Sequence, residues 1–234
     1  MKYQGEVWSK HRDFADPLLA IGVYDYVAAT VPWSVRWLAL LLGLEFGNKA
    51  RGKQRLEAAA EKAVLVGGDA AIMLVLIYTR EKEYEKAYQL LTGLGKKYPE
   101  NYFVQLDRAG LARRMRNFDL ATSVLSELLV RIQSGEFASS SLPRSAVYHQ
   151  LGLSSRAAGK LRAAEGWFRI SLQDPDCPKS HRTMAHLELA KTLDLAGRHE
   201  DAGAHYEQVL KAEDVGGSRR EARSLIHSGF RPEF

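Results

Sequence analysis

The sequence predicts an all-α protein, a solenoid of about twelve short antiparallel helices wound as a right-handed α-α superhelix. Three observations support this fold class. Apolar residues recur at intervals of three and four, helix-breaking residues interrupt that period roughly every 12 to 18 positions, and one arrangement of small and large residues repeats from about residue 68 to residue 214. The sustained alternation that is typical of strands is nearly absent.

The helical period is clear at Ile72, Val75, Leu76 and Thr79, which lie three or four positions apart. Breakers such as Tyr98-Pro99 separate the periodic segments. Four polar residues stand where helices are expected to begin, and each is predicted to accept hydrogen bonds from the free N–H groups of the first turn. These residues are Asp16, Asn48, Asp69 and Asn117.

The repeat is found by aligning four alanines. Ala87 and Ala121 are 34 residues apart, and Ala164 and Ala202 follow at spacings of 43 and 38. The extra residues enter between helix pairs, mainly from Ser134 to Leu142. Each alanine is expected where the second helix of a pair crosses the first, because a larger side chain there would push the axes apart.

Four segments carry the repeat: LIYTREKEYEKAYQLLTGLGKKYPEN, LARRMRNFDLATSVLSELL, YHQLGLSSRAAGKLRAAEGWFRISL and LELAKTLDLAGRHEDAGAHYEQVL. They cover about residues 68 to 214 and resemble the tetratricopeptide repeat, although the family's early Trp is missing and only the first segment has the closing proline, Pro99. Upstream, the order GVYDYV, VPW, LLGLEFGNKARGKQRLEAAAEKA is similar to a subset of bacterial tetratricopeptide proteins. It is also distantly similar to the eukaryotic inclusion-body-clearance family.

The expected organisation has three parts. Residues 1–67 form a divergent, aromatic-rich helical region that is continuous with the solenoid, residues 68–214 hold the four repeats, and residues 215–234 form a capping helix and tail. The most apolar stretch runs from Val27 to Phe46, and we expect it to be buried, with a helix from Trp33 to Phe46. Its uninterrupted apolar run is too short to span a bilayer, so we expect no transmembrane segment.

Composition narrows the class of partner. The net charge of +5 and the pI near 9.2 are modest and are not concentrated in a tail, so nucleic acid is not expected as a partner. Cys177 is the single cysteine, which excludes an intramolecular disulfide. The start MKYQGEVWSKHRDF lacks the apolar core of a signal peptide. We therefore expect a cytoplasmic protein, or a periplasmic one if the natural chain begins earlier.

No motif for catalysis is apparent. Gly47 to Lys53 has the spacing of a phosphate-binding loop, but Gln54 stands where Ser or Thr should hold Mg²⁺, and we interpret the segment as a turn and a helix start. The cations Lys49, Arg51, Lys53 and Arg55 are interpreted as a solvated surface, with an anion site as the alternative. The histidines show no metal-ligand spacing. We expect no cofactor, no metal and no enzymatic activity.

The resemblance implies that the first helix of each pair lines a concave groove that binds a protein or peptide. Arg80, Arg113 and Arg156 occupy equivalent positions on these helices, and a guanidinium binds carboxylates well, so an acidic segment is the favoured ligand. The candidate binding residues are Arg80, Arg113, Arg114, Arg156, Met73, Leu76, Gln150 and Lys191.

Three alternatives remain open at this stage. The arginines could instead pair with neighbouring acidic residues or simply face water. The chain could self-assemble into a homo-oligomer through N-terminal aromatic residues, which are Trp8, Tyr24, Tyr26, Trp33 and Trp37. A ligand-binding or enzymatic domain built on helical repeats is the third alternative.

Overall fold

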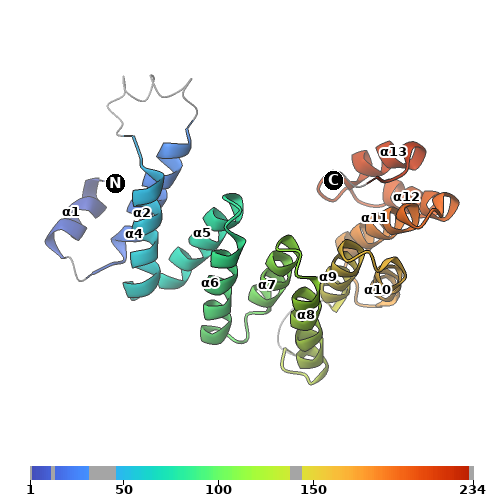
Figure 1. Ribbon diagram of the computed structural model, residues 1–234, viewed down its shortest axis with the longest axis horizontal. Coiled ribbons are helices and arrows are strands. Elements are labelled where there is room, and N and C mark those ends of the chain that lie inside the picture. Colours follow the sequence, from blue (N-terminus) through green and yellow to red (C-terminus); the bar gives the residue numbers. More distant parts are fainter. Residues whose placement is uncertain (1, 12–13, 32–45, 138–143, 232–234) are drawn as a thin grey trace. The chain divides into compact units, whose positions relative to one another are not determined.

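The computed structural model describes residues 2–11, 14–31, 46–137 and 144–231. Within these ranges it contains twelve α-helices and no strand, so the all-α fold class is confirmed (Figure 1). The predicted helix from Trp33 to Phe46 lies almost entirely outside the described residues. The chain divides into two compact units, Met1–Lys97 and Tyr98–Phe234, which are described separately below.

Unit 1 holds five described helices: α1 (Lys2–Lys10), α2 (Pro17–Thr30), α4 (Lys49–Lys62), α5 (Gly67–Arg80) and α6 (Tyr84–Lys97). From α2 onward each described helix packs against the next one, and α1 packs against α2. Ala15, Leu18, Ala59 and Ala70 form a buried cluster, and the half-buried Trp8 packs against it. The segment before residue 68 therefore shares one compact unit with α5 and α6, while the three-part division of the chain stays a prediction.

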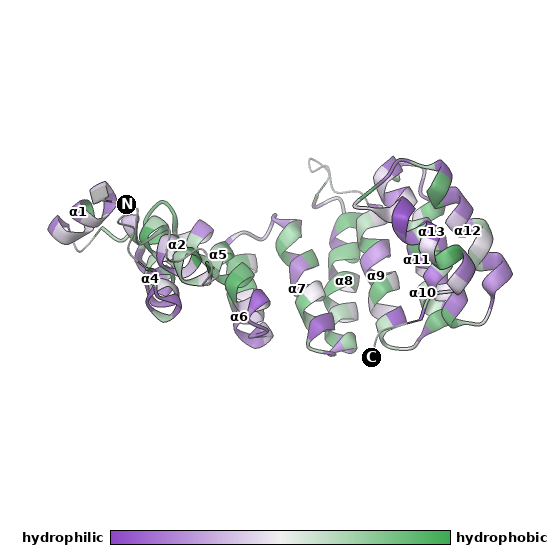
Figure 2. Cartoon of the chain, turned by 90° about the horizontal axis from the view of Figure 1, so that it is seen from above, coloured by the Kyte–Doolittle hydropathy of each residue, from purple (hydrophilic) through white to green (hydrophobic). Residues whose placement is uncertain are grey.

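Unit 2 holds seven described helices: α7 (Tyr102–Arg114), α8 (Phe118–Gln133), α9 (Arg144–Ala157), α10 (Leu161–Gln173), α11 (Lys179–Leu195), α12 (His199–Lys211) and α13 (Ser218–Ser228). Consecutive helices pack against one another, and α7 and α11 also contact α9. Hydrophobic and hydrophilic residues alternate along α7, α8 and α9, as expected of helices that bury one face (Figure 2).

The repeated alanines lie where the sequence predicts them. Ala87, Ala121, Ala164 and Ala202 have no exposed surface. Small residues on the first helix meet the second helix closely, and the best example is Gly152 on α9. A Cβ atom added at Gly152 would lie 2.5 Å from Phe168 Cε1 on α10. The missing side chain thus lets the buried ring of Phe168 fill the crossing.

Four turns between paired helices share one backbone conformation. The residue five positions before each repeated alanine has a left-handed backbone, and these residues are Lys82 (φ 63°), Arg116 (φ 59°), Gly159 (φ 73°) and Gly197 (φ 75°). In the first turn the N–H of Glu83 donates to the carbonyl of Tyr78 at 2.8 Å, and the equivalent bond recurs in the other three. This is the Schellman helix end, which satisfies the last carbonyls of the first helix and starts the second helix in a fixed direction.

Two of the four predicted helix caps are confirmed. Asn48 accepts a hydrogen bond from the N–H of Arg51, and Asn117 accepts one from Leu120. The prediction for Asp16 is wrong, because its carboxylate makes no cap bond and instead accepts the N–H groups of residues 64 to 66 before α5. The prediction for Asp69 is also wrong: α5 begins at Gly67, which places Asp69 inside the first turn.

We expect Gly152→Ala to lower the free energy of unfolding by about 1–3 kcal/mol, because the new methyl group overlaps the ring of Phe168. Gly166→Ala is the matched control in α10, where nothing lies within 4 Å of the added Cβ atom. That change should raise the free energy of unfolding by roughly 0.5–1 kcal/mol. Urea unfolding followed by circular dichroism measures both, and equal effects would contradict the close crossing.

Candidate functional site

The first helices of the pairs in unit 2 enclose an apolar hollow. Packing of α7 and α11 against α9 leaves a hollow of about 400 Å³ between them. It is lined by Tyr102, Phe103 and Leu106 from α7, Ala146, His149 and Gln150 from α9, and His181 and Met184 from α11. Phe103 is 62% exposed and its ring centroid lies 4.3 Å from that of Tyr102. Exposed aromatic residues at the edge of a hollow are typical of a surface that binds something apolar.

His149 is the polar residue set deepest in this hollow. Its Nδ1 atom is buried and has no hydrogen-bond partner among the described residues. Its ring meets the ring of Phe168 edge to face, with centroids 5.6 Å apart. Burial lowers the pKa of His149 to about 4, because the opposing effect of Glu188 is too small to offset it. His149 is therefore neutral at pH 7.

A cationic region adjoins the hollow at the end of α7. The half-buried Arg113 donates from Nη1 to Oε1 of Gln150 at 2.8 Å, so the acceptor of this bond is a neutral amide. Within the described ranges no carboxylate lies within ion-pair distance of Arg113. Burial, followed by the charges of Arg114 and Arg156, lowers the pKa of Arg113. This end of the groove thus carries an excess of positive charge.

Arg156 pairs with an acidic residue of the same unit, as one of the alternatives above expects. Its guanidinium forms an ion pair with the carboxylate of Glu188 and also donates to the Glu188 carbonyl at 3.2 Å. Burial alone would raise the pKa of Glu188, but Arg156 and Lys191 together lower it below its ordinary value. A ligand carboxylate at Arg156 would have to compete with this pair.

Lys191 is buried rather than exposed in the groove. Only 7% of it is exposed, and its ammonium group lies 3.0 Å from Glu188 and 2.6 Å from Glu221. Lys191 on α11 lies in the interior because α13 packs against α11 and its Glu221 pairs with the lysine. The sequence marks α13 as a cap but does not show which residues it covers.

In unit 1 the candidate residues Met73, Leu76 and Arg80 share a smaller hollow of about 170 Å³. It lies between α2 and α5, and its remaining lining residues are Val23, Tyr26, Val27 and Ile77. Leu76 is 59% exposed and Val27 is 52% exposed, so apolar surface faces outward here. Arg80 is exposed, and no ion pair of its side chain is found in the described part of the chain. The sequence thus placed these three residues on one face correctly.

The basic cluster at the start of α4 has a structural role that the sequence did not indicate. Arg51 and Arg55 both form ion pairs with Asp25 on α2, whose side chain is 4% exposed. Lys53 lies 3.0 Å from Glu83 and also pairs with Glu81. The interpretation as a solvated basic surface therefore holds for the exposed Lys49, but it is wrong for Lys53 and Arg55, which are half-buried in ion pairs. The partners are 26 or more positions away in the sequence, so no local pattern shows them.

The glycines of the phosphate-loop spacing are explained by packing. A Cβ atom at Gly52 would lie 2.7 Å from the backbone N of Tyr26, and one at Gly47 would overlap the carbonyl of Asp25. Both glycines therefore allow α2 and the start of α4 to approach closely. Gly52 also lies within the helix α4 rather than in a loop.

Of the aromatic residues considered for self-association, Trp8, Tyr24 and Tyr26 lie in the described ranges, and none of the three is fully exposed. Trp8 is half-buried, and Tyr26 is buried with its hydroxyl donating to Glu81 at 3.1 Å. Trp33 and Trp37 lie outside the described residues. This part of the structure therefore gives no specific support for self-association through them.

One histidine pair was missed by sequence spacing. His186 on α11 and His205 on α12 have their Nδ1 atoms 2.9 Å apart. Burial, with smaller effects of His205 and Arg182, lowers the pKa of His186 to about 4. The two residues are 19 positions apart on different helices, so only helix packing brings them together. Among the described residues no group of three or more His, Cys, Asp or Glu side chains could hold a metal ion.

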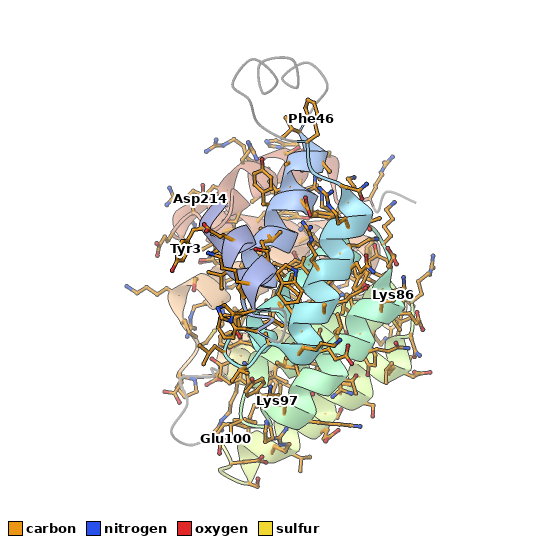
Figure 3. The ribbon with its side chains drawn as sticks, turned by 90° about the vertical axis from the view of Figure 1, so that its left-hand side faces the viewer. Tyr3, Phe46, Lys86, Lys97, Glu100 and Asp214 are labelled. Atoms are coloured by element: carbon orange, nitrogen blue, oxygen red, sulfur yellow. The ribbon has the colours of Figure 1, made fainter. Side chains whose placement is uncertain are left out.

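A further hollow of about 500 Å³ lies in unit 1 between α4, α5 and α6. Glu57 and Glu61 line it from α4, and Lys86 and Lys97 line it from the two ends of α6 (Figure 3). Because charges of both signs line it, the hollow has no clear preference for one sign of ligand. None of the described helices is long and apolar enough to cross a membrane.

Comparison with protein-family models gave no match, and comparison with curated protein sequences gave none. Solved structures do match. PilF of Pseudomonas aeruginosa is 19% identical with a TM-score of 0.53, over 92% of this chain and 87% of that one. TTC0263, a thermophilic TPR protein of Thermus thermophilus, is 16% identical with a TM-score of 0.53, over 91% and 98% of the two chains.

YrrB, described as a TPR protein with an unusual peptide-binding site, is 13% identical with a TM-score of 0.51, over 95% of this chain and 98% of that one. Likeness at these identities establishes the fold. The chain has the tetratricopeptide-repeat fold, as the repeated alanines predicted. The distant similarity to the inclusion-body-clearance family stays a prediction.

We expect the stability of the protein to fall as the pH is lowered from about 6.5 to 5. The pKa of His149 is about 4 in the folded chain and 6.5 in its ordinary state, so the unfolded chain binds more protons in this range. His149→Gln should make the pH dependence of the unfolding free energy shallower. His227→Gln is the control, because the side chain of His227 is exposed in the folded chain. Parallel pH profiles for wild type and His149→Gln would contradict the buried, neutral state.

Proposed function

We propose that the chain is a non-catalytic scaffold that binds an acidic segment of a partner protein along the first-helix groove of unit 2. Arg113 is the observation that carries the proposal. Its half-buried guanidinium donates to the neutral amide of Gln150, and burial and the charges of Arg114 and Arg156 lower its pKa more than Glu188 raises it. A ligand carboxylate would supply the missing negative charge through charge-assisted hydrogen bonds.

The groove also defines the spacing within the ligand. Leu106 in the hollow and Arg113 are seven positions apart on one face of α7, which corresponds to roughly 10 Å along the helix. A ligand in the polyproline II conformation advances about 3.1 Å per residue and has three residues per turn, so side chains three positions apart lie on the same face. A ligand that places an apolar side chain in the hollow therefore reaches Arg113 with a carboxylate about three residues further along.

The non-catalytic part of the proposal is supported by how unit 2 uses its buried charged groups. Glu188 and Asp194 are both occupied with partners inside the unit, Glu188 with Arg156 and Lys191, and Asp194 with Tyr206. The peptide-binding site named for YrrB supports the scaffold role by analogy of fold. In unit 1, the face formed by Met73, Leu76 and Arg80 is proposed as a separate contact region for a partner.

We expect a fluorescent peptide with a Leu followed three residues later by a Glu to bind the wild-type chain at least tenfold more tightly than the same peptide with Gln. A hydrogen bond to a charged group contributes about 1.5–3 kcal/mol, and about 1.4 kcal/mol is tenfold in affinity. In the Arg113→Gln variant the two peptides should bind equally. Fluorescence anisotropy measures both affinities.

Arg162→Gln is the matched control, because Arg162 is exposed and belongs to the second helix α10. Thermal unfolding of each variant shows that the fold is kept. The acidic-ligand proposal fails if the wild-type chain does not prefer the Glu peptide, or if Arg162→Gln abolishes the preference as strongly as Arg113→Gln does.

A further inference from the structure

The end of the described chain folds back onto the first helices of unit 2. α13 ends at Ser228, and Gly229 then turns the backbone with φ at +68°, a conformation that favours glycine. The N–H of Phe230 donates to Oδ2 of Asp194 on α11 at 2.7 Å. After α13 the backbone of residues 229 and 230 thus turns back and contacts α11.

The ring of Phe230 lies against two cations. The guanidinium carbon of Arg156 and the ammonium nitrogen of Lys191 are each 5.6 Å from its centroid. Both cations also hold Glu188, and Lys191 reaches Glu221 as well. An aromatic face attracts cations, so the ring contacts this charge network favourably while adding no charge to it.

Asp194 gives the site a second, polar point of recognition. Its side chain is 2% exposed, and it accepts from the hydroxyl of Tyr206 at 2.7 Å and lies 2.9 Å from Nδ1 of His199. The backbone N–H of Phe230 is a third partner. Any backbone N–H presented in the same way can make that bond. The aromatic side chain is therefore what makes the site selective.

The geometry points to a docking site for a glycine–aromatic peptide segment at the C-terminal ends of α9 and α11, which we propose the chain's own Gly229 and Phe230 fill in the isolated protein. A partner protein with such a segment binds here by displacing the tail. A hollow of about 240 Å³ beside Phe230, lined in part by Asp194, His199 and Tyr206, leaves room for that exchange. The site uses neither Arg113 nor the apolar hollow, so it is independent of the acidic-ligand proposal.

The test uses the 234-residue chain with Phe230→Ala and a labelled peptide with the sequence of residues 226–231, Ile-His-Ser-Gly-Phe-Arg. We expect this peptide to bind the variant at least tenfold more tightly than it binds wild type. The wild-type tail is tethered, and its high effective concentration keeps the peptide out. The same peptide with Ala in place of Phe should lose at least tenfold in affinity for the variant.

Phe14→Ala is the matched control, because Phe14 is an exposed phenylalanine of unit 1 that lines none of the hollows described above, and its loss should not admit the peptide. Circular dichroism checks that both variants keep their helices. The proposal is overturned if the Phe230→Ala variant does not bind the peptide, if it binds no better than wild type does, or if the Ala peptide binds equally well. It is also overturned if the wild-type chain sediments as a dimer that Phe230→Ala dissociates, since a second copy would then be the occupant.

Discussion

The close crossing of paired helices at a residue with little or no side chain is the constraint on which the rest of the structure depends. Four alanines at these crossings have no exposed surface, and Gly152 goes further by admitting the ring of Phe168. In unit 1, α2 and α4 use the same device through Gly22 and Gly52, where an added Cβ atom would lie within 3.0 Å of the other helix. Larger side chains would separate the axes and open the buried clusters between them. In unit 2 the first helices α7, α9 and α11 keep a face on which the apolar hollow lies.

The turns between paired helices determine where the two helices cross. A left-handed residue stands five positions before each alanine, whatever the spacing between repeats, and the Schellman bond that accompanies it fixes where the second helix starts. Insertions are therefore tolerated between pairs but not within them. Lys82 and Arg116 adopt this conformation without being glycine, which shows that tertiary packing outweighs their local backbone preference. The backbone conformation at the helix ends is thus repeated as regularly as the pattern of apolar residues.

Several basic residues near the helix crossings have acidic partners, whereas Arg113 beside the apolar hollow has none within ion-pair distance among the described residues. Asp25, Glu81, Glu83 and Glu188 each hold cations inside a unit, so most of the basic residues that attract notice in the sequence already have partners. Arg113 differs because its side-chain hydrogen bond goes to a neutral amide, and because burial and the charges of Arg114 and Arg156 outweigh the opposing effect of Glu188 on its pKa. At the other end of unit 2, Phe230 covers Arg156 and Lys191 with an uncharged ring. In the part of the chain that the structure describes, Arg113 therefore lacks a carboxylate partner, whereas Arg156 and Lys191 are paired and lie under the ring of Phe230. The acidic-ligand site is proposed at the first of these places and the glycine–aromatic site at the second.

The sequence by itself determined the fold class, the crossing alanines and the helix caps at Asn48 and Asn117, because periodicity, residue size and capping are local properties. It also brought Met73, Leu76 and Arg80 to one face, since three positions on a single helix suffice for that. Only the tertiary structure decided which charges are free. The partners of Arg51, Lys53 and Arg156 lie 26 to 32 positions away, and Asp16 bonds to backbone groups about 50 positions away. The burial of Lys191 under α13 and the return of Phe230 to Asp194 depend on the packing of separate helices, which the spacing of residues along one chain does not specify.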